Sequence, residues 1–411
     1  MQSLPLFTNK KEILQTLLVM VVLFITSLSY EFYKYKNITT YSLYKTTAKV
    51  LNVYKKDGKN YRVLKLKSDN FTFYTTYKKT LELNRDDEIK IIFYTKGIDF
   101  YRYLKGFYVY SKTIKLEKKS EIKSVVRFVE NQHKNSMIKE LYSALFFATP
   151  ISKILRKDIS KWGIAHLVAI SGFHLGILSA ILYFLLKPIY TFFQDRYFPY
   201  RNRSADLAFI VFLILGYYTY FLGATPSILR AFVMSLVGFF LFSHNIKIIS
   251  FGTLFFTVCI ILILFIHLIF SIAFWLSVSG VFYIFLFLHH FSKLNKIAIF
   301  VLLNFWVYLL MLPIVHIIFD TFSWYQLFSP FISMLFLLFY PLSIFLHLVG
   351  LGGLMDSYIV QFLSLHVEVT SLVTPMWFFV SYIVLSLFAI RFRFLVFVLL
   401  LSALSLILGL I

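Results

Sequence analysis

The chain has 411 residues, of which 59% are hydrophobic and 20% aromatic, with a mean hydropathy of +0.76 and a formal net charge of +22. Soluble domains are nearer half apolar, so this composition excludes a soluble core as the main architecture and predicts a polytopic α-helical membrane protein. The single cysteine, Cys259, excludes a disulfide framework and a cysteine-based zinc site.

Residues 13–30 form the first apolar run, directly after Lys10 and Lys11. A run of this length can cross about 30 Å of hydrocarbon as a helix. No small-residue cleavage site follows it, so we expect residues 1–30 to be a retained membrane anchor rather than a cleaved signal peptide.

Residues 31–161 carry most of the charge, with 29 of the 41 Lys and Arg and 13 of the 19 Asp and Glu, a net charge of +16. Such a basic excess favours polyanions, namely nucleic acid or anionic lipid, although a lysine-biased composition explains it equally simply.

Five segments rich in aromatic and β-branched residues predict short strands. They are 44–54, 61–67, 71–77, 89–95 and 107–115, with a turn at 57–60.

Five short strands suit a small barrel of the OB type over residues 31–120, although other five-stranded domains would fit. Residues 121–160 then show apolar residues at helical spacing. We expect amphipathic helices there that lie at the membrane surface and lead into a membrane core of residues 161–350 and a C-terminal part of residues 351–411.

Nine further apolar runs bring the number of predicted spans to ten. They lie at 164–187, 205–222, 227–243, 249–266, 268–288, 297–319, 325–349, 376–390 and 394–411. Four short connections are basic, namely 187–204, 243–248, 289–296 and 391–393, and the positive-inside rule makes basic connections cytoplasmic. The residue 31–120 domain is then expected outside the cytoplasm, in a chain that sits in the cell inner membrane.

The fourth basic connection agrees with the other three only if residues 354–373 form an eleventh span. This segment contains Asp356, Gln361, His366 and Glu368, so as a span it would have to face water or protein. An amphipathic helix at the interface is the equal alternative.

Residues 166–178 read His-Leu-Val-Ala-Ile-Ser-Gly-Phe-His-Leu-Gly-Ile-Leu, an apolar run with polar and small interruptions. Ser171 and His174 are three residues apart and so share a helix face, and Gly172 and Gly176 form a G-x-x-x-G pattern that permits close helix contact. The spacing fits a polar stripe along a path, and equally histidines buried against neighbouring helices. A serine hydrolase needs Ser171 within reach of a base, and His174 on the same helix is poorly placed for that.

A second block runs from Gly223 to Met234 and places Arg230 near the end of a span that Pro226 and Ser227 open. A buried arginine is costly in a membrane, so we expect Arg230 to contact a phosphate or an acidic side chain, with an interfacial anchor as the alternative. In a third block, Leu276 and Ser277 lie mid-span, where helix packing is the ordinary role. The sequence has no P-loop, no H-E-x-x-H and no other metal motif, so we expect no cofactor, no metal and no ATPase activity.

These blocks resemble the ComEC family of bacterial competence proteins, over about residues 140–345. His166 to His174 match the family's hallmark, and Pro226-Ser227-x-x-Arg230 is similar to its second block. Phe274-x-Leu276-Ser277 resembles the third block, with Trp275 where Gln is common. Pro313, Phe319, Ser323 and Pro330 follow the fourth, with Ser329 where Asn is usual.

The resemblance implies a non-enzymatic inner-membrane channel through which one DNA strand enters the cytoplasm during natural transformation. It implies as partners single-stranded DNA, membrane lipid, a periplasmic DNA receptor and a cytoplasmic motor or single-strand-binding protein, and it leaves a homo-oligomer open. Many relatives carry a metallo-β-lactamase-like C-terminal domain. This sequence reaches Ile411 inside an apolar segment and lacks that domain's motif, so we do not expect a nuclease.

We expect the motif residues to line or shape the translocation path. They are His166, Ser171, Gly172, His174, Gly176, Pro226, Ser227, Arg230, Leu276 and Ser277. Basic residues interleaved with aromatic ones predict DNA contact by the β domain, because single strands bind through stacking and charge. These candidates are Tyr61, Arg62, Lys65, Lys67, Phe73, Tyr77, Lys78 and Lys79. A membrane-embedded hydrolase using Ser171 and a secondary transporter of a small anionic solute remain alternatives.

Overall fold

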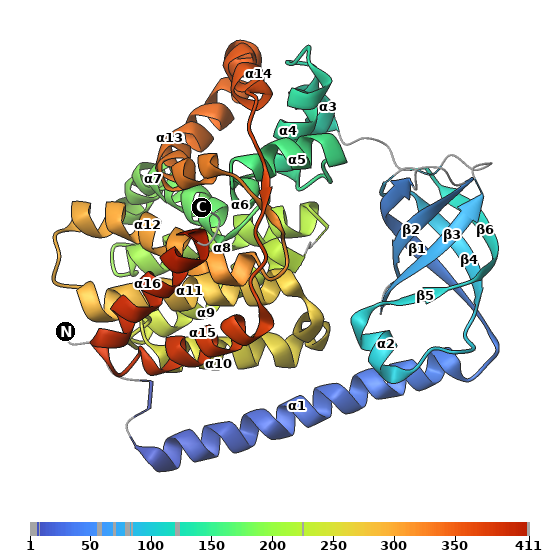
Figure 1. Ribbon diagram of the computed structural model, residues 1–411, viewed down its shortest axis with the longest axis horizontal. Coiled ribbons are helices and arrows are strands. Elements are labelled where there is room, and N and C mark those ends of the chain that lie inside the picture. The colour runs from blue at the N-terminus through green and yellow to red at the C-terminus, as the bar shows by residue number, and fades with distance from the viewer. Residues whose placement is uncertain are drawn as a thin grey trace. The chain divides into compact units, whose positions relative to one another are not determined.

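The fold is taken from a computed structural model (Figure 1). It describes residues 6–7, 9–55, 60–68, 71–78, 83, 85–119, 124–223 and 226–408. The chain divides into two compact units. The helical unit comprises Met1–Leu6, Val125–Val258 and Ile272–Ile411, and the β unit comprises Phe7–Ser124 and Cys259–Ser271.

The β unit begins with the long helix α1 and contains a six-stranded sheet in the order β5-β3-β2-β1-β4-β6 (Figure 1). Its elements are α1 (Lys10–Thr39), β1 (Leu43–Lys55), β2 (Tyr61–Lys67), β3 (Thr72–Lys78), β4 (Glu88–Tyr94), α2 (Phe100–Lys105), β5 (Phe107–Val109), β6 (Ser111–Lys118) and η1 (Ile266–Phe270). Strand β3 pairs with β5 in parallel, and the other pairs are antiparallel. Only Tyr110 separates β5 from β6, so one nearly continuous strand joins the two edges of the sheet.

Each predicted β segment contains a strand, and the fifth is divided at Tyr110. Buried and accessible side chains alternate along the strands because one face of the sheet is buried. The inward side chains include Leu64, Leu66, Phe73 and Phe93, each 0% exposed. The helix α2 was not predicted from the sequence. Asp57, Gly58 and Lys59 of the predicted turn lie outside the described residues.

Among its described residues, the helical unit contains thirteen α-helices, most of them apolar, and a short pair of strands. They are α3 (Ser124–Glu130), α4 (Ser136–Phe147), α5 (Lys153–Lys161), α6 (Ala165–Val168), α7 (Gly172–Tyr197), α8 (Arg203–Phe221), α9 (Pro226–Ser243), α11 (Ile272–Phe291), α12 (Lys296–Val315), α13 (Ser329–Leu348), α14 (Asp356–Ser364), α15 (Met376–Phe388) and α16 (Arg393–Leu408), with the short pair β7 (Thr321–Phe322) and β8 (Thr370–Ser371). The 3₁₀ turns η2 (Trp324–Phe328) and η3 (Gly352–Met355) flank α13, and α10 (Phe251–Leu264) runs from this unit into the β unit. Figure 1 shows α3, α4 and α5 grouped beside α13 and α14.

Six helical segments are long and apolar enough to cross a membrane by length and composition. They are Lys10–Thr39, Gly172–Tyr197, Arg203–Phe221, Ile272–Phe291, Lys296–Val315 and Trp324–Leu348. Four shorter apolar helices, α9, α10, α15 and α16, account for the other predicted runs. The fold is therefore mostly helical and compatible with a polytopic membrane protein.

The predicted eleventh spanning helix is not formed. Residues 354–373 contain only the end of η3, the nine-residue α14, an extended stretch and β8, and nine helical residues reach only about 14 Å. Leu372 and Thr374 donate backbone hydrogen bonds to the carbonyls of Asp320 and His316, at 2.8 and 3.1 Å. The chain therefore leaves the C-terminal end of α12 and returns to it before α15 begins.

This return places the turn between α15 and α16 beside the turn between α11 and α12. The Nε2 atom of His290 lies 2.8 Å from the carbonyl oxygen of Ala389, and the guanidinium of Arg393 lies 5.2 Å from the Phe291 ring. The basic residues of these two turns thus share one end of the helices, as the charge pattern required, without an additional helix.

Candidate functional site

The four sequence blocks come together in the helical unit. A Cβ atom on Gly172, at the start of α7, would lie 3.7 Å from the Cβ of Ala231 in α9. In α9, Arg230 lies over the ring of Phe274, near the start of α11, at 5.9 Å. The Ser329 hydroxyl, at the start of α13, donates to the carbonyl of Gly163 at 3.1 Å. We call this meeting point, at the first turns of α7, α9 and α11 and the first half of α13, the motif cluster.

His166 joins α6 to α13 within this cluster. Its Nδ1 lies 3.0 Å from the carbonyl oxygen of Gly163 and its Nε2 lies 3.2 Å from the hydroxyl of Ser333. The side chain is exposed. His166 therefore links α6 to α13 while part of its ring stays accessible at the surface of the helical unit.

His174, in contrast, is sealed in the packed interior. Its side chain is 0% exposed and packs edge-on against the rings of Phe336 and Tyr340, with centroids 5.2 and 4.8 Å away. Of the two roles that the spacing left open, the buried one holds for His174. It does not line an aqueous path in this conformation.

Ser171 is the residue that caps α7, and this changes its relation to His174. The Ser171 backbone N–H donates to Nδ1 of His174 at 3.2 Å, and the hydroxyl oxygen lies 3.1 Å from the same atom. The prediction that His174 is poorly placed for Ser171 was wrong, because Ser171 lies just outside the helix in extended conformation. Nε2 of His174 makes no hydrogen bond within 3.5 Å to the described residues and lies toward the backbone of Leu167 rather than a carboxylate, so no acidic group orients the imidazole as a base. The contact is that of a helix cap.

The predicted close helix contact at Gly176 is not formed, because a Cβ atom there would meet nothing within 4 Å. Gly176 instead belongs to a series of exposed residues, all but His166 small, that runs along α6, the link to α7 and the start of α7, here called the α7 track. The α7 track consists of Ala165, His166, Ala169, Gly172, Gly176 and Ala180. Within α7, the spacing of four residues keeps Gly172, Gly176 and Ala180 on one side of the helix.

Arg230 is buried at 6% exposure, and its Nε and Nη1 atoms have no hydrogen-bond partner among the described residues. Near it, Pro226 begins α9 and Ser227 is half-buried. Leu276 packs into the hydrophobic cluster of α11, α12, α15 and α16, while Ser277 is exposed. Leu276 is thus a packing residue, as its mid-span position indicated.

The β unit divides the predicted DNA-binding residues between two faces. Phe73 is 0% exposed and Tyr77 is 7% exposed, so both are core residues and cannot stack on a base without unfolding the sheet. Arg62 pairs with Tyr77 in the register and shares its inward side. Tyr61 and Lys78 pair at the opposite ends of β2 and β3, and Lys79 lies outside the described residues.

Lys65 and Lys67 lie on the outer face of the sheet, where sequence reasoning missed the aromatic partners. Tyr74 lies opposite Lys65 in β3 and opposite Tyr108 in β5, and the Lys65 ammonium lies 5.8 Å from the Tyr74 ring. Tyr108 and Tyr110 are 45% and 72% exposed, and their rings meet edge-to-face at 5.2 Å. Burial raises the pKa of Tyr74, which keeps its phenol neutral. The alternation of Tyr108 and Tyr110 along one strand was the signal that could have identified this face.

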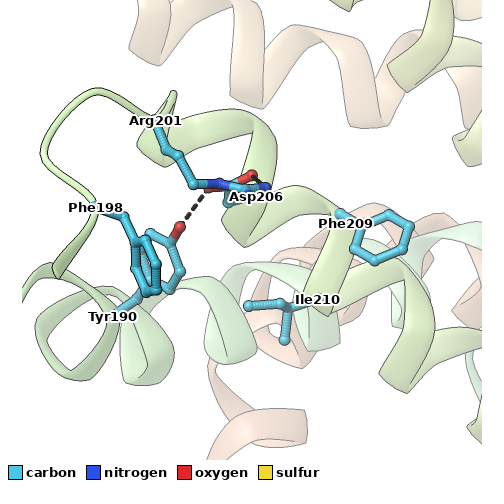
Figure 2. Close-up of a pocket in the computed structure, with 6 residues that line it drawn as sticks. All are labelled: Tyr190, Phe198, Arg201, Asp206, Phe209 and Ile210. Atoms are coloured by element: carbon cyan, nitrogen blue, oxygen red, sulfur yellow. Dashed lines mark hydrogen bonds and ion pairs between the residues drawn. The ribbon is translucent and has the colours of Figure 1, made fainter. Parts of the chain in front are cut away.

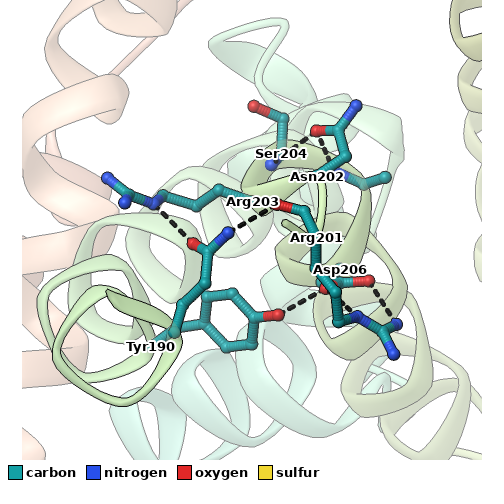
Figure 3. Close-up of polar contacts among 8 residues, drawn as sticks. Tyr190, Arg201, Asn202, Arg203, Ser204 and Asp206 are labelled. Atoms are coloured by element: carbon teal, nitrogen blue, oxygen red, sulfur yellow. Dashed lines mark hydrogen bonds and ion pairs between the residues drawn. The ribbon is translucent and has the colours of Figure 1, made fainter. Parts of the chain in front are cut away.

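The turn between α7 and α8 holds a pocket of about 250 Å³ lined by Tyr190, Phe198, Arg201, Asp206, Phe209 and Ile210 (Figure 2). Arg201 binds the Asp206 carboxylate through Nε at 2.6 Å and Nη2 at 2.7 Å, and Tyr190 donates to the same carboxylate. Figure 3 shows the adjoining contacts, in which Asn202 caps α8 through the N–H groups of Ser204 and Ala205. The Arg201 charge is already paired, so this pocket offers no free cation to an anionic ligand.

A second buried polar cluster, which the sequence did not reveal, links the α3–α4 turn to the end of α13. Nδ1 of His133 lies 2.9 Å from the Asp356 carboxylate, and its Nε2 lies 2.9 Å from Nε2 of His347. The Gln132 side chain donates to the His347 carbonyl at 3.0 Å and accepts from the Gly352 N–H at 2.8 Å. Among the described residues, no group of three or more metal-ligating side chains is placed to hold an ion.

Comparison with known proteins agrees with the geometry of the motif cluster. Residues 148–410 match the family described as "Competence protein", which is more than half of the chain and includes all four blocks. The chain belongs to the competence protein family. It is also 37% identical over 75 residues to "ComE operon protein 3" of Bacillus subtilis (strain 168), a match that covers 18% of this chain and 8% of that protein's length. No solved structure matches the chain.

Proposed function

We propose that this competence protein is a channel that carries single-stranded DNA into the cytoplasm and performs no chemistry of its own. The observation that carries the proposal is the motif cluster, where four distant sequence blocks meet beside the α7 track. Polar and small residues in an apolar helical region usually mark a bundle interior or a water-filled path. The exposed His166 at the start of the α7 track fits the mouth of such a path.

The orientation follows from the charged turns. The turns 292–295 and 389–392 lie together and carry Lys293, Arg391 and their neighbours, so the positive-inside rule assigns them to the cytoplasm. Because α11 ends at this side, its first turn, and with it the motif cluster, faces the opposite side of a cell inner membrane. DNA that arrives from outside would meet the cluster first.

The β unit is proposed to receive the strand. Its strand order, with β1 shared between two antiparallel partners and a parallel β3–β5 pair, supports the proposal of an OB-type barrel, in which the face of strands 2 and 3 binds oligonucleotides. Here that face carries Tyr74, Tyr108 and Tyr110 beside Lys65 and Lys67. Neither lysine has a carboxylate within 4 Å among the described residues, which leaves two charges for phosphate contacts while the rings stack on bases.

Membrane lipid, a periplasmic DNA receptor and a cytoplasmic motor or single-strand-binding protein are the partners that this function requires. A second copy of the chain against the α7 track is the competing explanation of its exposure, because small residues also mediate helix pairing. The translocation path and the helix-pairing explanation differ in one consequence. A residue that lines a path stays in contact with water, whereas a residue in a helix–helix contact does not.

The test is DNA uptake in a strain that lacks the gene and carries a plasmid copy of the protein. We expect the wild type to restore transformation and the double variant Tyr108→Ala/Tyr110→Ala to lower it, since each stacked base contributes about 1–3 kcal/mol. Tyr41→Ala is the matched control, because Tyr41 is 73% exposed and lies before the sheet. Failure of the wild type to restore uptake would overturn the channel, and an unchanged double variant would overturn the role of this face.

The contact between Ser171 and His174 is the one observation that favours a hydrolase instead. On that reading Ser171→Ala abolishes function and a serine-directed fluorophosphonate labels the wild type. On the channel proposal Ser171→Ala weakens only the cap of α7, at a cost of about 1 kcal/mol, and uptake persists. A small-anion transporter predicts that solute uptake, and not DNA uptake, is lost in the deletion strain.

A further inference from the structure

We propose that Arg230 and the first turns of α7, α9 and α11 form a binding site for a phosphodiester anion, which the DNA backbone occupies as it enters the path. The inference rests on the proposed function and deepens it, because it assigns a ligand contact to one residue of the motif cluster.

The first argument is the charge of Arg230. A guanidinium stays protonated in proteins, so it cannot escape burial by losing its proton. Arg230 is only 6% exposed, and two of its three nitrogens are buried without a hydrogen-bond partner. No carboxylate lies within 4 Å of it among the described residues, and its described contact is the face of Phe274 at 5.9 Å. A buried charge without a counter-charge is strongly unfavourable, which indicates that an anion completes the site.

The second argument is the direction of the surrounding helices. Arg230 lies in the second turn of α9, Ala231 beside it touches Gly172 at the first residue of α7, and Phe274 is the third residue of α11. The first turn of each helix carries free N–H groups and a partial positive charge. Phe274, which lies against the guanidinium, belongs to the first turn of α11, and α9 itself begins four residues before Arg230. These two helix starts add to the positive charge and favour an anion with several acceptor oxygens.

The third argument is access and shape. Gly172 is exposed, and it lies on the α7 track between the exposed His166 and Gly176. A phosphodiester has two non-bridging oxygens that share one negative charge and match the planar fork of an arginine, and a chain of such groups can pass along an open track of small residues. The phosphate of a lipid headgroup has the same chemistry, so the experiment must separate the two sources.

The experiment measures binding of a fluorescent oligothymidylate to the full chain in a phosphate-free sugar detergent, as a function of salt. For wild type we expect the logarithm of the affinity to fall with the logarithm of the salt concentration, by about 0.7 for each phosphate neutralised. Arg230→Gln should lower affinity about tenfold to a hundredfold, the range of one charge-assisted hydrogen bond, and should reduce the slope by about 0.7. Arg230→Lys should keep the slope.

Arg393→Gln is the matched control, because Arg393 also lies over a phenylalanine ring, at 5.2 Å from Phe291, but is exposed at the other end of the helices. It should leave affinity and slope unchanged. If Arg230→Gln does not fold, Arg230→Lys provides one comparison. Oligonucleotides with one neutral methylphosphonate linkage, placed at a different position in each titration, provide the other. A slope that is the same for Arg230→Gln and wild type would overturn the site.

Two further outcomes separate this inference from the proposed function. If short-chain phosphatidylglycerol raises the unfolding temperature of wild type but not of Arg230→Gln, and oligothymidylate raises neither, the site holds lipid and the DNA contact is wrong. If Arg230→Gln restores uptake as well as wild type in the deletion strain, the anion site is wrong and the channel stands. If wild type does not restore uptake, the channel is wrong whatever Arg230 binds.

Discussion

Replacing His133 by alanine should strongly destabilise the helical unit. The His133 side chain is fully buried, stacks on Tyr142 with ring centroids 4.6 Å apart, and joins Asp356 to His347. Nδ1 of His347 lies 2.6 Å from the carbonyl of Ser343 and must carry a proton there. Its Nε2 is therefore an acceptor, His133 donates to it, and the remaining His133 nitrogen shares a proton with Asp356.

The truncation leaves Asp356 and His347 without this shared partner. The buried Nε2 of His347, left unpaired, costs about 1–3 kcal/mol, and the Asp356 carboxylate, whose side chain is 20% exposed, adds less because water reaches it. Loss of the ring stack adds about 0.5–1.5 kcal/mol. The assay is the unfolding temperature in detergent, with His347→Ala and the double variant completing a cycle. We expect the loss of stability in the double variant to be clearly smaller than the sum of the losses in the two single variants, because both single changes remove the same contact.

Lys134→Ala is the control for His133→Ala, since Lys134 is the exposed neighbour. It should leave the unfolding temperature unchanged. A His133→Ala protein as stable as Lys134→Ala, or additive effects in the cycle, would refute the reasoning from the buried chain of hydrogen bonds.

Three other predictions concern single positions. Burial lowers the pKa of His267, but the Glu31 carboxylate 3.5 Å from Nε2 and the backbone carbonyl that accepts from Nδ1 outweigh it, so the pKa is raised above 6.5. The stabilisation from His267 is then complete below pH 6.5 and is lost as the pH rises through the raised value, and His267→Gln should remove this pH dependence of the unfolding temperature. Gly353→Ala should destabilise by about 1–3 kcal/mol, because its Cβ would lie 2.7 Å from the backbone oxygen of Gln132. Asp206→Asn should change the unfolding temperature little, because its ion pair is exposed to solvent and screened by salt.

Each of these three predictions can be contradicted by a specific result. An identical pH profile for wild type and His267→Gln would remove the ionic contact from the account. Gly280→Ala is the control for Gly353→Ala, because a Cβ there meets nothing within 4 Å, and equal behaviour of the two would show that the close approach is relaxed. A large loss of stability in Asp206→Asn would mean that the α7–α8 turn matters more than its exposure indicates.

The sequence predicted the repetitive elements and missed the contacts between them. Runs of apolar residues and alternating strands are local patterns, so the spans and the β segments were accessible to it. That Gly172 meets Ala231, or that Arg230 lies over Phe274, depends on how helices far apart in the chain pack, and no local pattern records it. The charge pattern did predict that Arg393 lies with the earlier basic turns.

The errors have physical causes. Ser171 was placed on the helix, whereas its extended backbone makes it the cap and turns its side chain toward His174. Phe73 and Tyr77 were taken as surface rings because an aromatic in a strand reads the same on either face, and only the register shows which face is inside. The contact between His133 and His347 joins residues 214 positions apart, so no local pattern in the sequence indicates it.

The most direct test of the central claim is the accessibility of the α7 track to water. Cys259 is the single cysteine, so a Cys259→Ser background accepts cysteine at Gly172, Gly176 or Ala180, one at a time. We predict that a membrane-impermeant thiol reagent labels all three in membranes, that oligothymidylate slows the labelling, and that cysteine at Leu185, which is 55% exposed on the opposite side of the same helix, stays unlabelled. If the three track positions resist the reagent as Leu185→Cys does, α7 faces lipid or another protein surface there, and the path is not where we place it.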